Sequence, residues 1–274
     1  MDNSEDVKIR EKNVIDKQLS ISNISGSPKI SDSNISKLNN LSINEFSELI
    51  KVCLDLELYE EGYTYILRLI ELRNNNLKEE ERNYLMKLAK EKLNIFRKGW
   101  KNLVDYDQSE NEMTIKTLID EQMLILEKNI KQFCNEIDKL VDKLLEITPD
   151  NDLPAVIFYK KLKADYLRYY AEVANQDEFN IVVDKCQDLY EKTYDMCKSL
   201  DQPCNALNLS VALNYSVFAY FIVDDTKKAY EIADKAYKTA INKISDNKNP
   251  EIDVLIKNIE DNLTIWKIEL FDAN

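Results

Sequence analysis

Apolar residues recur every three or four positions through most of the chain, which is the spacing of one face of an α-helix. The longest stripe runs from Ile119 to Leu144, with steps that alternate between four and three residues. Its members are Ile119, Met123, Leu126, Ile130, Phe133, Ile137, Leu140 and Leu144. Two shorter stripes lie within 43–53 and 89–103. Each stripe predicts an amphipathic helix with its apolar side against the core.

Polar clusters separate these periodic segments and predict where helices end. The clusters are Asn74-Asn75-Asn76, Tyr106 to Glu112, Thr148-Pro149-Asp150, Gln202-Pro203 and Asn247 to Pro250. The pattern predicts about nine helices, near 43–57, 59–73, 78–104, 113–147, 153–175, 178–199, 204–222, 226–243 and 250–270. No segment shows the strict alternation of a strand. Because short connections favour antiparallel neighbours, we predict an all-α protein built from helical hairpins.

The first forty residues differ from the rest of the chain. Residues 1–40 hold eight Ser, six Asn and no aromatic residue. Such a segment has too little apolar surface to offset the entropy of ordering it. We therefore expect a disordered arm over 1–40 and a folded helical domain over 41–274.

Composition removes most classes of enzyme. The chain has 274 residues, no His and only 3 Gly. Without His there is no Ser-His-Asp triad and no His-ligated metal, and three glycines cannot build a phosphate-binding glycine loop. Two carboxylates acting as acid and base remain formally possible. We expect no catalytic residues, no metal and no cofactor.

Charge and cysteine usage restrict the partners and the compartment. There are 37 basic and 50 acidic residues, and the net charge of −13 disfavours a nucleic-acid partner. No apolar run of about 18 residues predicts a membrane span, and no secretory signal pattern opens the chain. The cysteines lack CxxC spacing: Cys53, Cys134, Cys186, Cys197 and Cys204. These features favour a cytoplasmic protein with buried or free thiols rather than disulfides or a zinc site.

Several segments, taken in order, carry a resemblance to a known family. They are EERNYL at 80–85 followed by Arg97 and Trp100, CNEI at 134–137, KADYLRYYAEV at 163–173, LNYSVF at 213–218 and DNLTIW at 261–266. They resemble the third, fourth, fifth, seventh and ninth helices of the 14-3-3 family, respectively. The resemblance covers roughly 42–270. It implies nine antiparallel helices, a cupped dimer and a concave groove that binds phosphoserine or phosphothreonine peptides.

Basic residues within these segments are spaced to share helix faces. Lys90 and Arg97 lie seven residues apart, as do Lys161 and Arg168, so each pair is separated by two helical turns. A phosphate dianion needs several convergent donors, and Arg offers a two-pronged fork. The same spacing also occurs on ordinary solvated helix faces. By itself it therefore leaves both interpretations open.

The resemblance assigns roles to particular residues. It implies a phosphate-binding set of Lys90, Arg97, Arg168 and Tyr169, with Lys161 as a nearby basic residue. It implies main-chain contacts to the bound peptide from Asn214 and Asn262, and an apolar wall of Leu213, Val217, Ile265 and Trp266. An amide suits an extended peptide because it offers a donor and an acceptor together. Asp165 lies three residues before Arg168, and we expect it to orient a functional side chain.

Two positions depart from the family in the predicted groove. Phe221 stands where the family usually has an acid that reads basic peptide residues, and Asn258 replaces an apolar wall residue. The resemblance thus implies that the phosphate-binding set, here called the phosphate anchor, is retained, while the surfaces that select the surrounding peptide sequence have changed.

The positions that resemble the family's dimer interface have also changed character. The first two helices of one subunit meet the third and fourth of the other in that family, partly through salt bridges. Here Leu58 and Ile125 replace basic residues, Asn129 replaces an acid and Gln122 replaces an aromatic residue, while Glu45 and Glu61 remain acidic. One interpretation is a more apolar homodimer; the other is a weak dimer whose acids repel. We favour the apolar dimer, because exposed apolar side chains beside Val52 and Leu56 would form a patch that monomers usually avoid.

Two functions compete at this point. One is a non-catalytic adaptor that clamps phosphorylated client proteins in a groove. The other is a helical protein-interaction scaffold that no longer depends on phosphate. Affinity for matched phosphorylated and unphosphorylated peptides separates them. Neither requires a nucleic acid or a membrane.

Overall fold

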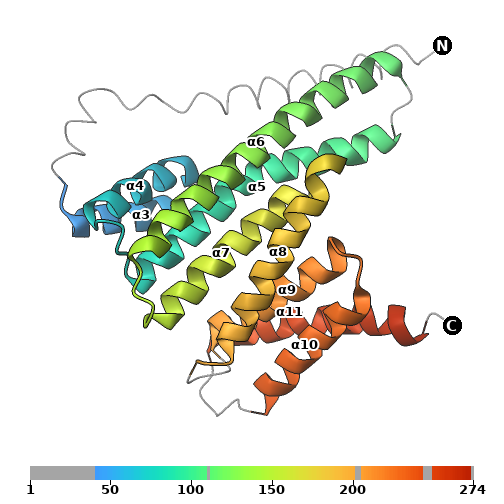
Figure 1. The fold of residues 1–274 in the computed structure, drawn as a ribbon. Helices are drawn as coiled ribbons and strands as arrows, with labels where there is room; N and C mark the ends of the chain where they lie inside the picture. Colours follow the sequence, from blue (N-terminus) through green and yellow to red (C-terminus); the bar gives the residue numbers. More distant parts are fainter. Residues whose placement is uncertain (1–40, 110–111, 201–204, 243–248, 273–274) are drawn as a thin grey trace. The chain divides into compact units, whose positions relative to one another are not determined.

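The computed structural model describes residues 41–109, 112–200, 205–242 and 249–272. Within these ranges the chain forms nine α-helices, one π-helical turn and no strand (Figure 1). They are α3 (Ile43–Asp55), α4 (Tyr59–Leu72), α5 (Glu79–Ser109), α6 (Met113–Ile147), α7 (Leu153–Ala171), α8 (Gln176–Cys197), α9 (Ala206–Phe221), α10 (Thr226–Ile241), α11 (Pro250–Lys267) and the turn η1 (Ile268–Asp272). The predicted all-α fold is confirmed. The predicted arm 1–40 and the break at Gln202-Pro203 lie outside the described residues.

The chain divides into two compact units, which meet in sequence between Leu72 and Arg73. In the first, α3 and α4 pack together as a hairpin. Its core includes Phe46, Ile50 and Ile66, each at most 1% exposed.

The start of α3 is fixed by a reciprocal cap. The Ser42 hydroxyl accepts from the Glu45 backbone N–H at 3.3 Å, and the Glu45 carboxylate accepts from the Ser42 backbone N–H at 2.7 Å. Together these contacts satisfy two donors that a helix start leaves without partners. The carboxylate of Glu45 thus has a local role at the start of its own helix.

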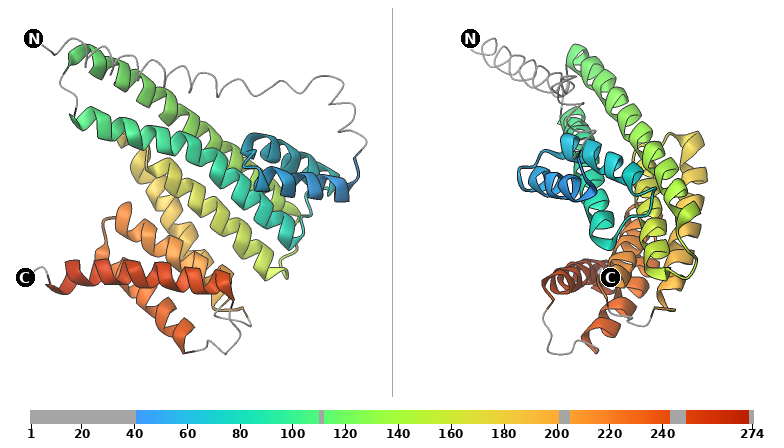
Figure 2. Two further views of the ribbon diagram at one scale, coloured as in Figure 1. Left: turned by 180° about the vertical axis from the view of Figure 1, so that it is seen from behind. Right: turned by 90° about the vertical axis from the view of Figure 1, so that its left-hand side faces the viewer.

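The second unit holds α5 to α11, and each helix packs against the next along the chain (Figure 2). Helix α9 departs from this simple order, because it also packs against α7 and against α11. Helices α5, α7, α9 and α11 are the ones that carry the candidate binding residues. The additional contacts therefore bring three of these four helices together.

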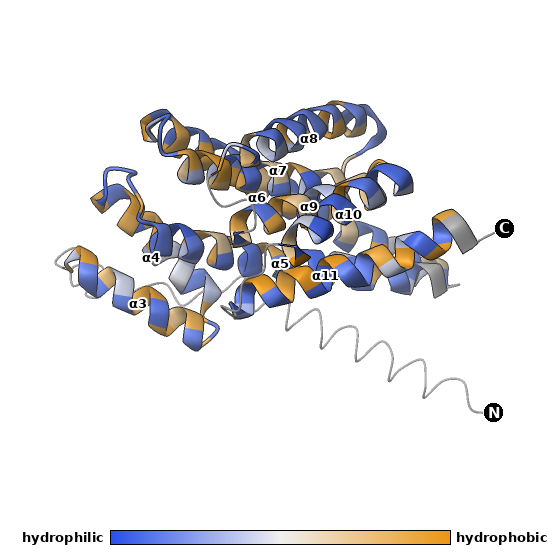
Figure 3. Cartoon of the chain, turned by 90° about the horizontal axis from the view of Figure 1, so that it is seen from below, coloured by the Kyte–Doolittle hydropathy of each residue, from blue (hydrophilic) through white to orange (hydrophobic). Residues whose placement is uncertain are grey.

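The apolar face of α6 matches the stripe expected from its sequence. Its buried residues are Ile119, Leu126, Ile130, Phe133, Cys134, Ile137, Val141 and Leu144. The central helix α7 is buried on more of its circumference than a surface helix, because α6, α8 and α9 all pack against it. Most other helices show alternating apolar and polar colour along their length, as amphipathic elements do (Figure 3).

Most predicted helix boundaries agree with the structure to within a few residues, and two differences have physical causes. Helix α5 continues to Ser109 beyond the predicted end at 104. The segment 105–109 contains polar residues but neither Gly nor Pro, so nothing in it forces the helix to end. Helix α7 ends at Ala171 rather than 175, because Asn175 and Glu178 form a capping box that begins α8 at Gln176.

The described cysteines agree with the expectation from the sequence. Cys53, Cys134, Cys186 and Cys197 are all free and buried. Burial raises the pKa of the Cys134 and Cys186 thiols, which keeps them protonated and unreactive. Among the described residues, no helix combines the length and the apolar character that crossing a membrane requires.

Candidate functional site

Three contacts link the four helices that carry the predicted site residues. Arg97 on α5 pairs with Glu172 at the end of α7, with a closest N–O distance of 2.7 Å. On α9, the Asn214 Nδ2 group donates to Asp165 of α7 at 2.7 Å. The rings of Tyr220 on α9 and Trp266 on α11 lie 5.2 Å apart. The fold therefore connects side chains that are far apart in the sequence into one continuous set.

Two arginines and one tyrosine form the centre of this set. Arg97 Nε and Nη2 donate to the two oxygens of Glu172 at 2.7–2.9 Å, and Arg168 Nη1 donates to the same carboxylate at 3.2 Å. The Cζ atoms of Arg97 and Arg168 lie 4.2 and 4.3 Å from the centre of the Tyr169 ring. Two cations that the sequence places on different helices thus converge on one aromatic ring.

This cluster is largely shielded from solvent. The side chains of Arg97 and Arg168 are only 15% and 11% exposed. Burial acts to lower the pKa of Arg168, but the charges and polar groups of Tyr169, Tyr190, Asp165 and Glu172 raise it above its ordinary value. Arg168 is therefore a permanent cation in a water-poor setting, where its interactions with an anion are stronger than at an open surface.

Lys90 lies apart from this bonded cluster. It is exposed on α5, seven residues before Arg97, and makes no ion pair with any residue that the structure describes. A long flexible side chain on the same helix face can still approach an anion that sits beside Arg97.

A second acidic residue of α7 organises the neighbouring polar groups. Asp165 accepts from Lys161 Nζ at 2.7 Å, from the Tyr190 hydroxyl at 2.6 Å and from Asn214 Nδ2 at 2.7 Å. Burial acts to raise the pKa of Asp165, but the charges of Lys161 and Arg168 and the hydrogen bonds outweigh it and lower the pKa. Because Nδ2 of Asn214 is turned toward Asp165, its carbonyl oxygen points away as an acceptor.

We expect Asp165 to orient a functional side chain, and that side chain is not Arg168, because the carboxylate bonded to Arg168 belongs to Glu172. Asp165 instead fixes Lys161, whose side chain is only 7% exposed. Lys161 thus reaches the site through Asp165 rather than as an open cation.

The predicted apolar wall is only partly at the surface. Leu213 and Val217 on α9 are half-buried, and Ile265 on α11 is 53% exposed. Trp266 is 2% exposed and packs in the core with Ala229 and Ile259. Asn262 is half-buried on α11. In this structure Ile265 presents the apolar surface, and Trp266 supports it from within.

Glu172 is the residue of this cluster that sequence reasoning missed. It follows Arg168 by four residues, the spacing of a helical ion pair, so that contact had a signal in the sequence. Its stronger contact is with Arg97, which lies 75 positions away. No pattern in the sequence indicated that contact.

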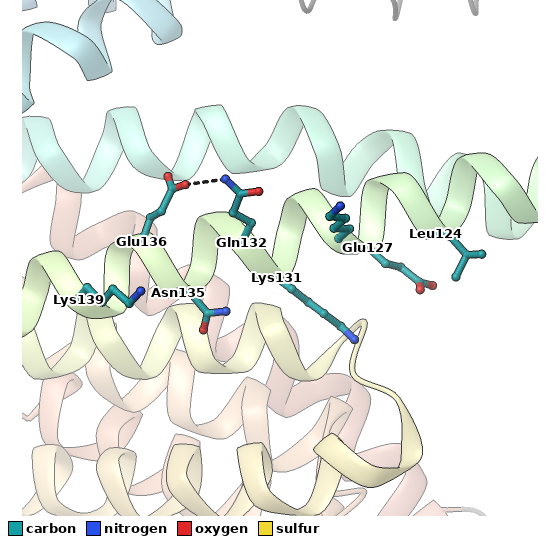
Figure 4. Close-up of a pocket in the computed structure, with 8 residues that line it drawn as sticks. Leu124, Glu127, Lys131, Gln132, Asn135, Glu136 and Lys139 are labelled. Carbon is teal, nitrogen blue, oxygen red and sulfur yellow. Dashed lines mark hydrogen bonds between the residues drawn. The ribbon is translucent and has the colours of Figure 1, made fainter.

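Two surface hollows lie elsewhere in the described part of the chain. One, of about 640 Å³, is lined by residues of α6 between Leu124 and Lys139 (Figure 4). The other lies among α6, α7 and α8 around Tyr166 and Leu189. Neither hollow includes a predicted site residue. Among the described residues, no group of three or more His, Cys, Asp or Glu side chains is arranged to hold a metal ion.

Comparison of the sequence with known proteins identifies its family. The family model described as "14-3-3 protein" matches residues 49–267. The chain is 31% identical over 220 residues to 14-3-3-like protein 2 of Caenorhabditis elegans, covering 79% of this chain and 88% of that protein. It is 32% identical over 197 residues to 14-3-3 protein homolog 2 of Schistosoma mansoni, covering 70% and 92%. It is 29% identical over 231 residues to 14-3-3 protein 2 of Entamoeba histolytica, covering 82% and 95%. The chain therefore belongs to the 14-3-3 family, whose members are non-catalytic adaptor proteins.

Proposed function

We propose that this protein is an adaptor that binds phosphoserine- or phosphothreonine-containing segments of client proteins. The observation that carries the proposal is the convergence of Arg97 and Arg168 on the Tyr169 ring, at 4.2 and 4.3 Å. In a chain of net charge −13, two shielded guanidinium groups side by side form a local site for an anion. A phosphate dianion matches them better than a carboxylate, because it brings more charge and more acceptor oxygens.

Each predicted residue has a role in this proposal. Arg97, Arg168, the Tyr169 hydroxyl and Lys90 bind the phosphoryl group. Asn214 and Asn262 bond to the main chain of the extended client segment, and Asp165 with Lys161 holds Asn214 in place. The apolar residues Leu213, Val217, Ile265 and Trp266 support the side of the segment away from the phosphate. The adaptor acts by masking the client segment or imposing a shape on it.

One observation favours the alternative, a scaffold that no longer needs phosphate. Both guanidinium groups already bond to Glu172, so part of their charge is offset within the chain. In that case the exposed apolar side chains, among them Phe221 at 70% exposed, would carry the protein contacts.

A direct binding experiment separates the two functions. A library of phosphopeptides and the same peptides without phosphate are titrated against the full chain by fluorescence anisotropy or calorimetry. The adaptor proposal requires phosphate-dependent binding, with affinity at least about tenfold higher than for the unphosphorylated twins. Equal affinity for both members of every pair would favour the scaffold instead.

We further propose that the protein is a cytoplasmic homodimer that associates through its N-terminal helices. The buried free cysteines support a reducing compartment. Exposed apolar side chains support a drier contact than the salt-bridged one implied by the family: Val52, Leu56 and Leu58 on or beside α3, and Ile125 on α6, are between 42% and 63% exposed.

A further inference from the structure

We infer that Glu172 is the positioning residue of the phosphate anchor: its carboxylate holds the guanidinium groups of Arg97 and Arg168 together in the geometry that an incoming anion needs. This inference rests on the proposed phosphopeptide function and deepens it. It concerns a residue that contacts the two cations rather than the ligand.

Glu172 accepts from some of the N–H groups of each guanidinium and leaves others available. A guanidinium carries five N–H groups. Glu172 engages the edge of Arg97 formed by Nε and Nη2, and Nη1 reaches Asn94 Oδ1 at 3.2 Å. Arg168 gives Glu172 only Nη1, and its Nε is buried with no hydrogen-bond partner among the described residues. Both cations are fixed in orientation, and both keep donors for a further acceptor.

The repulsion between the two arginines explains why a bridging carboxylate is needed. Two like charges beside one ring repel each other, and exposures of 15% and 11% leave little water to screen them. A single carboxylate that accepts from both offsets this repulsion. The three groups together still carry one net positive charge, before Lys90 is counted. The anchor is therefore assembled and still attractive to an anion.

The backbone fixes where this carboxylate sits. Glu172 is the C-terminal cap of α7, and its N–H donates to the carbonyl of Arg168 at 3.2 Å. Its side chain therefore projects from the same helix end that carries Arg168 and Tyr169. Because both of its oxygens are engaged, moving it away would release both guanidinium groups at once.

A competing role for Glu172 predicts the opposite result. A carboxylate in a phosphate site can act as an internal competitor, and neutralising it then strengthens binding because the site becomes more positive. If Glu172 instead positions the arginines, neutralising it weakens binding despite the extra positive charge. The sign of the effect therefore decides between competition and positioning.

The first test measures phosphopeptide affinity of the full-length chain. Glu172→Gln removes the charge and keeps the side-chain shape, and we expect roughly a tenfold or greater loss of affinity. Glu172→Asp keeps the charge on a shorter stem and should show a smaller loss. The control is Glu136→Gln on α6, which changes the net charge by the same amount. Glu136 is exposed and accepts a hydrogen bond from Gln132 (Figure 4). This control should leave affinity unchanged. Unchanged or higher affinity in Glu172→Gln overturns the inference.

The second test needs no ligand and so does not depend on the proposed function. Nitrogen-15 NMR of the arginine side chains reports the hydrogen exchange of each Nε–H group. We expect the Arg97 Nε–H to exchange at least about tenfold faster in Glu172→Gln, and to a lesser extent in Glu172→Asp, than in the wild type. Unchanged exchange in both variants overturns the positioning role. If the wild type binds no phosphopeptide, the proposed function is wrong, but the positioning of the arginines by Glu172 is still decided by the exchange rates.

Discussion

Arg168 is the least exposed cation of the proposed phosphate-binding set of Lys90, Arg97 and Arg168. It is 11% exposed, contacts the Tyr169 ring and shares Glu172 with Arg97. Because its neighbours raise its pKa further above the physiological range, no change of pH in which the protein stays folded removes its charge. Only substitution can test it.

Arg168→Ala should therefore abolish phosphopeptide binding. Losing its charge-assisted hydrogen bonds costs about 1.5–3 kcal/mol each, which corresponds to at least a tenfold loss of affinity. Since Arg168 also offsets the charge of buried Asp165, we expect a lower melting temperature with unchanged helical content by circular dichroism. Arg168→Lys keeps the charge but not the fork and should recover stability more than affinity. Wild-type affinity in Arg168→Ala would remove this residue from the site.

The pKa of Asp165 gives a prediction for stability against pH. Its folded-state pKa is lowered, so the carboxylate stabilises the protein at pH values above its unfolded pKa of about 3.9. That contribution is lost as the pH falls through the still lower folded pKa. Asp165→Asn should thus be less stable than the wild type near neutral pH, and the gap should shrink below about pH 4. Urea unfolding of both proteins at about five pH values between pH 2.5 and 7 measures this difference in the free energy of unfolding. A difference that stays constant with pH would contradict the predicted titration.

Phe221 offers a test of how the surroundings of the phosphosite are read. It is 70% exposed at the end of α9. The resemblance to the family implies an acid at this position in most members. We expect the wild type to show no preference for phosphopeptides with Arg upstream of the phosphosite. Phe221→Glu should create a preference for Arg upstream, with an affinity ratio of up to about fivefold, because exposed ion pairs contribute about 0–1 kcal/mol. Paired phosphopeptides with Arg or Gln upstream measure it, and a strong Arg preference in the wild type would contradict the expectation.

At the scale of whole helices, the sequence was sufficient for most of the fold. Periodicity located α6 and its buried face, and Asn74 and Asn75 mark the break after α4 with left-handed φ angles of 50° and 65°. The contacts between helices were not predictable in the same way. Arg97 and Glu172, or Asp165 and Asn214, meet only because their helices pack together, and spacing along one helix carries no information about that.

The cap of α8 shows how a local signal sets an element boundary. Asn175 accepts from the Glu178 backbone N–H at 3.0 Å, and Glu178 accepts in return from the Asn175 N–H at 3.3 Å. Asn175→Ala should lower the free energy of unfolding by about 1 kcal/mol, the usual cost of losing an N-cap. The matched control is Asn258→Ala on the exposed side of α11, which should be neutral or slightly stabilising because Ala favours helices. Equal effects of the two changes in urea titrations would show that the cap contributes nothing specific.

At the scale of the whole molecule, the remaining question is how the chain associates with itself. Leu58 and Ile125 are 42% and 51% exposed. The resemblance to the family implies basic interface residues at both positions. Burying apolar surface stabilises association by about 25 cal/mol per Å², whereas exposed ion pairs contribute about 0–1 kcal/mol each. The interface proposed here therefore depends on apolar contact and should resist salt.

This dimer can be tested by light scattering of the full-length chain at salt concentrations from 0.05 to 1 M, about a twentyfold range. We expect a dimer at micromolar concentration whose mass does not change with salt, because screening weakens ion pairs but not apolar contacts. Leu58→Glu should shift the chain to monomer by placing an uncompensated charge in the contact. The double variant Leu58→Arg with Asn129→Glu rebuilds the opposite charges implied by the family and should give a dimer that salt weakens. A wild-type monomer rules out the dimer, whereas a wild-type dimer that salt alone dissociates rules out the apolar interface and leaves the dimer standing.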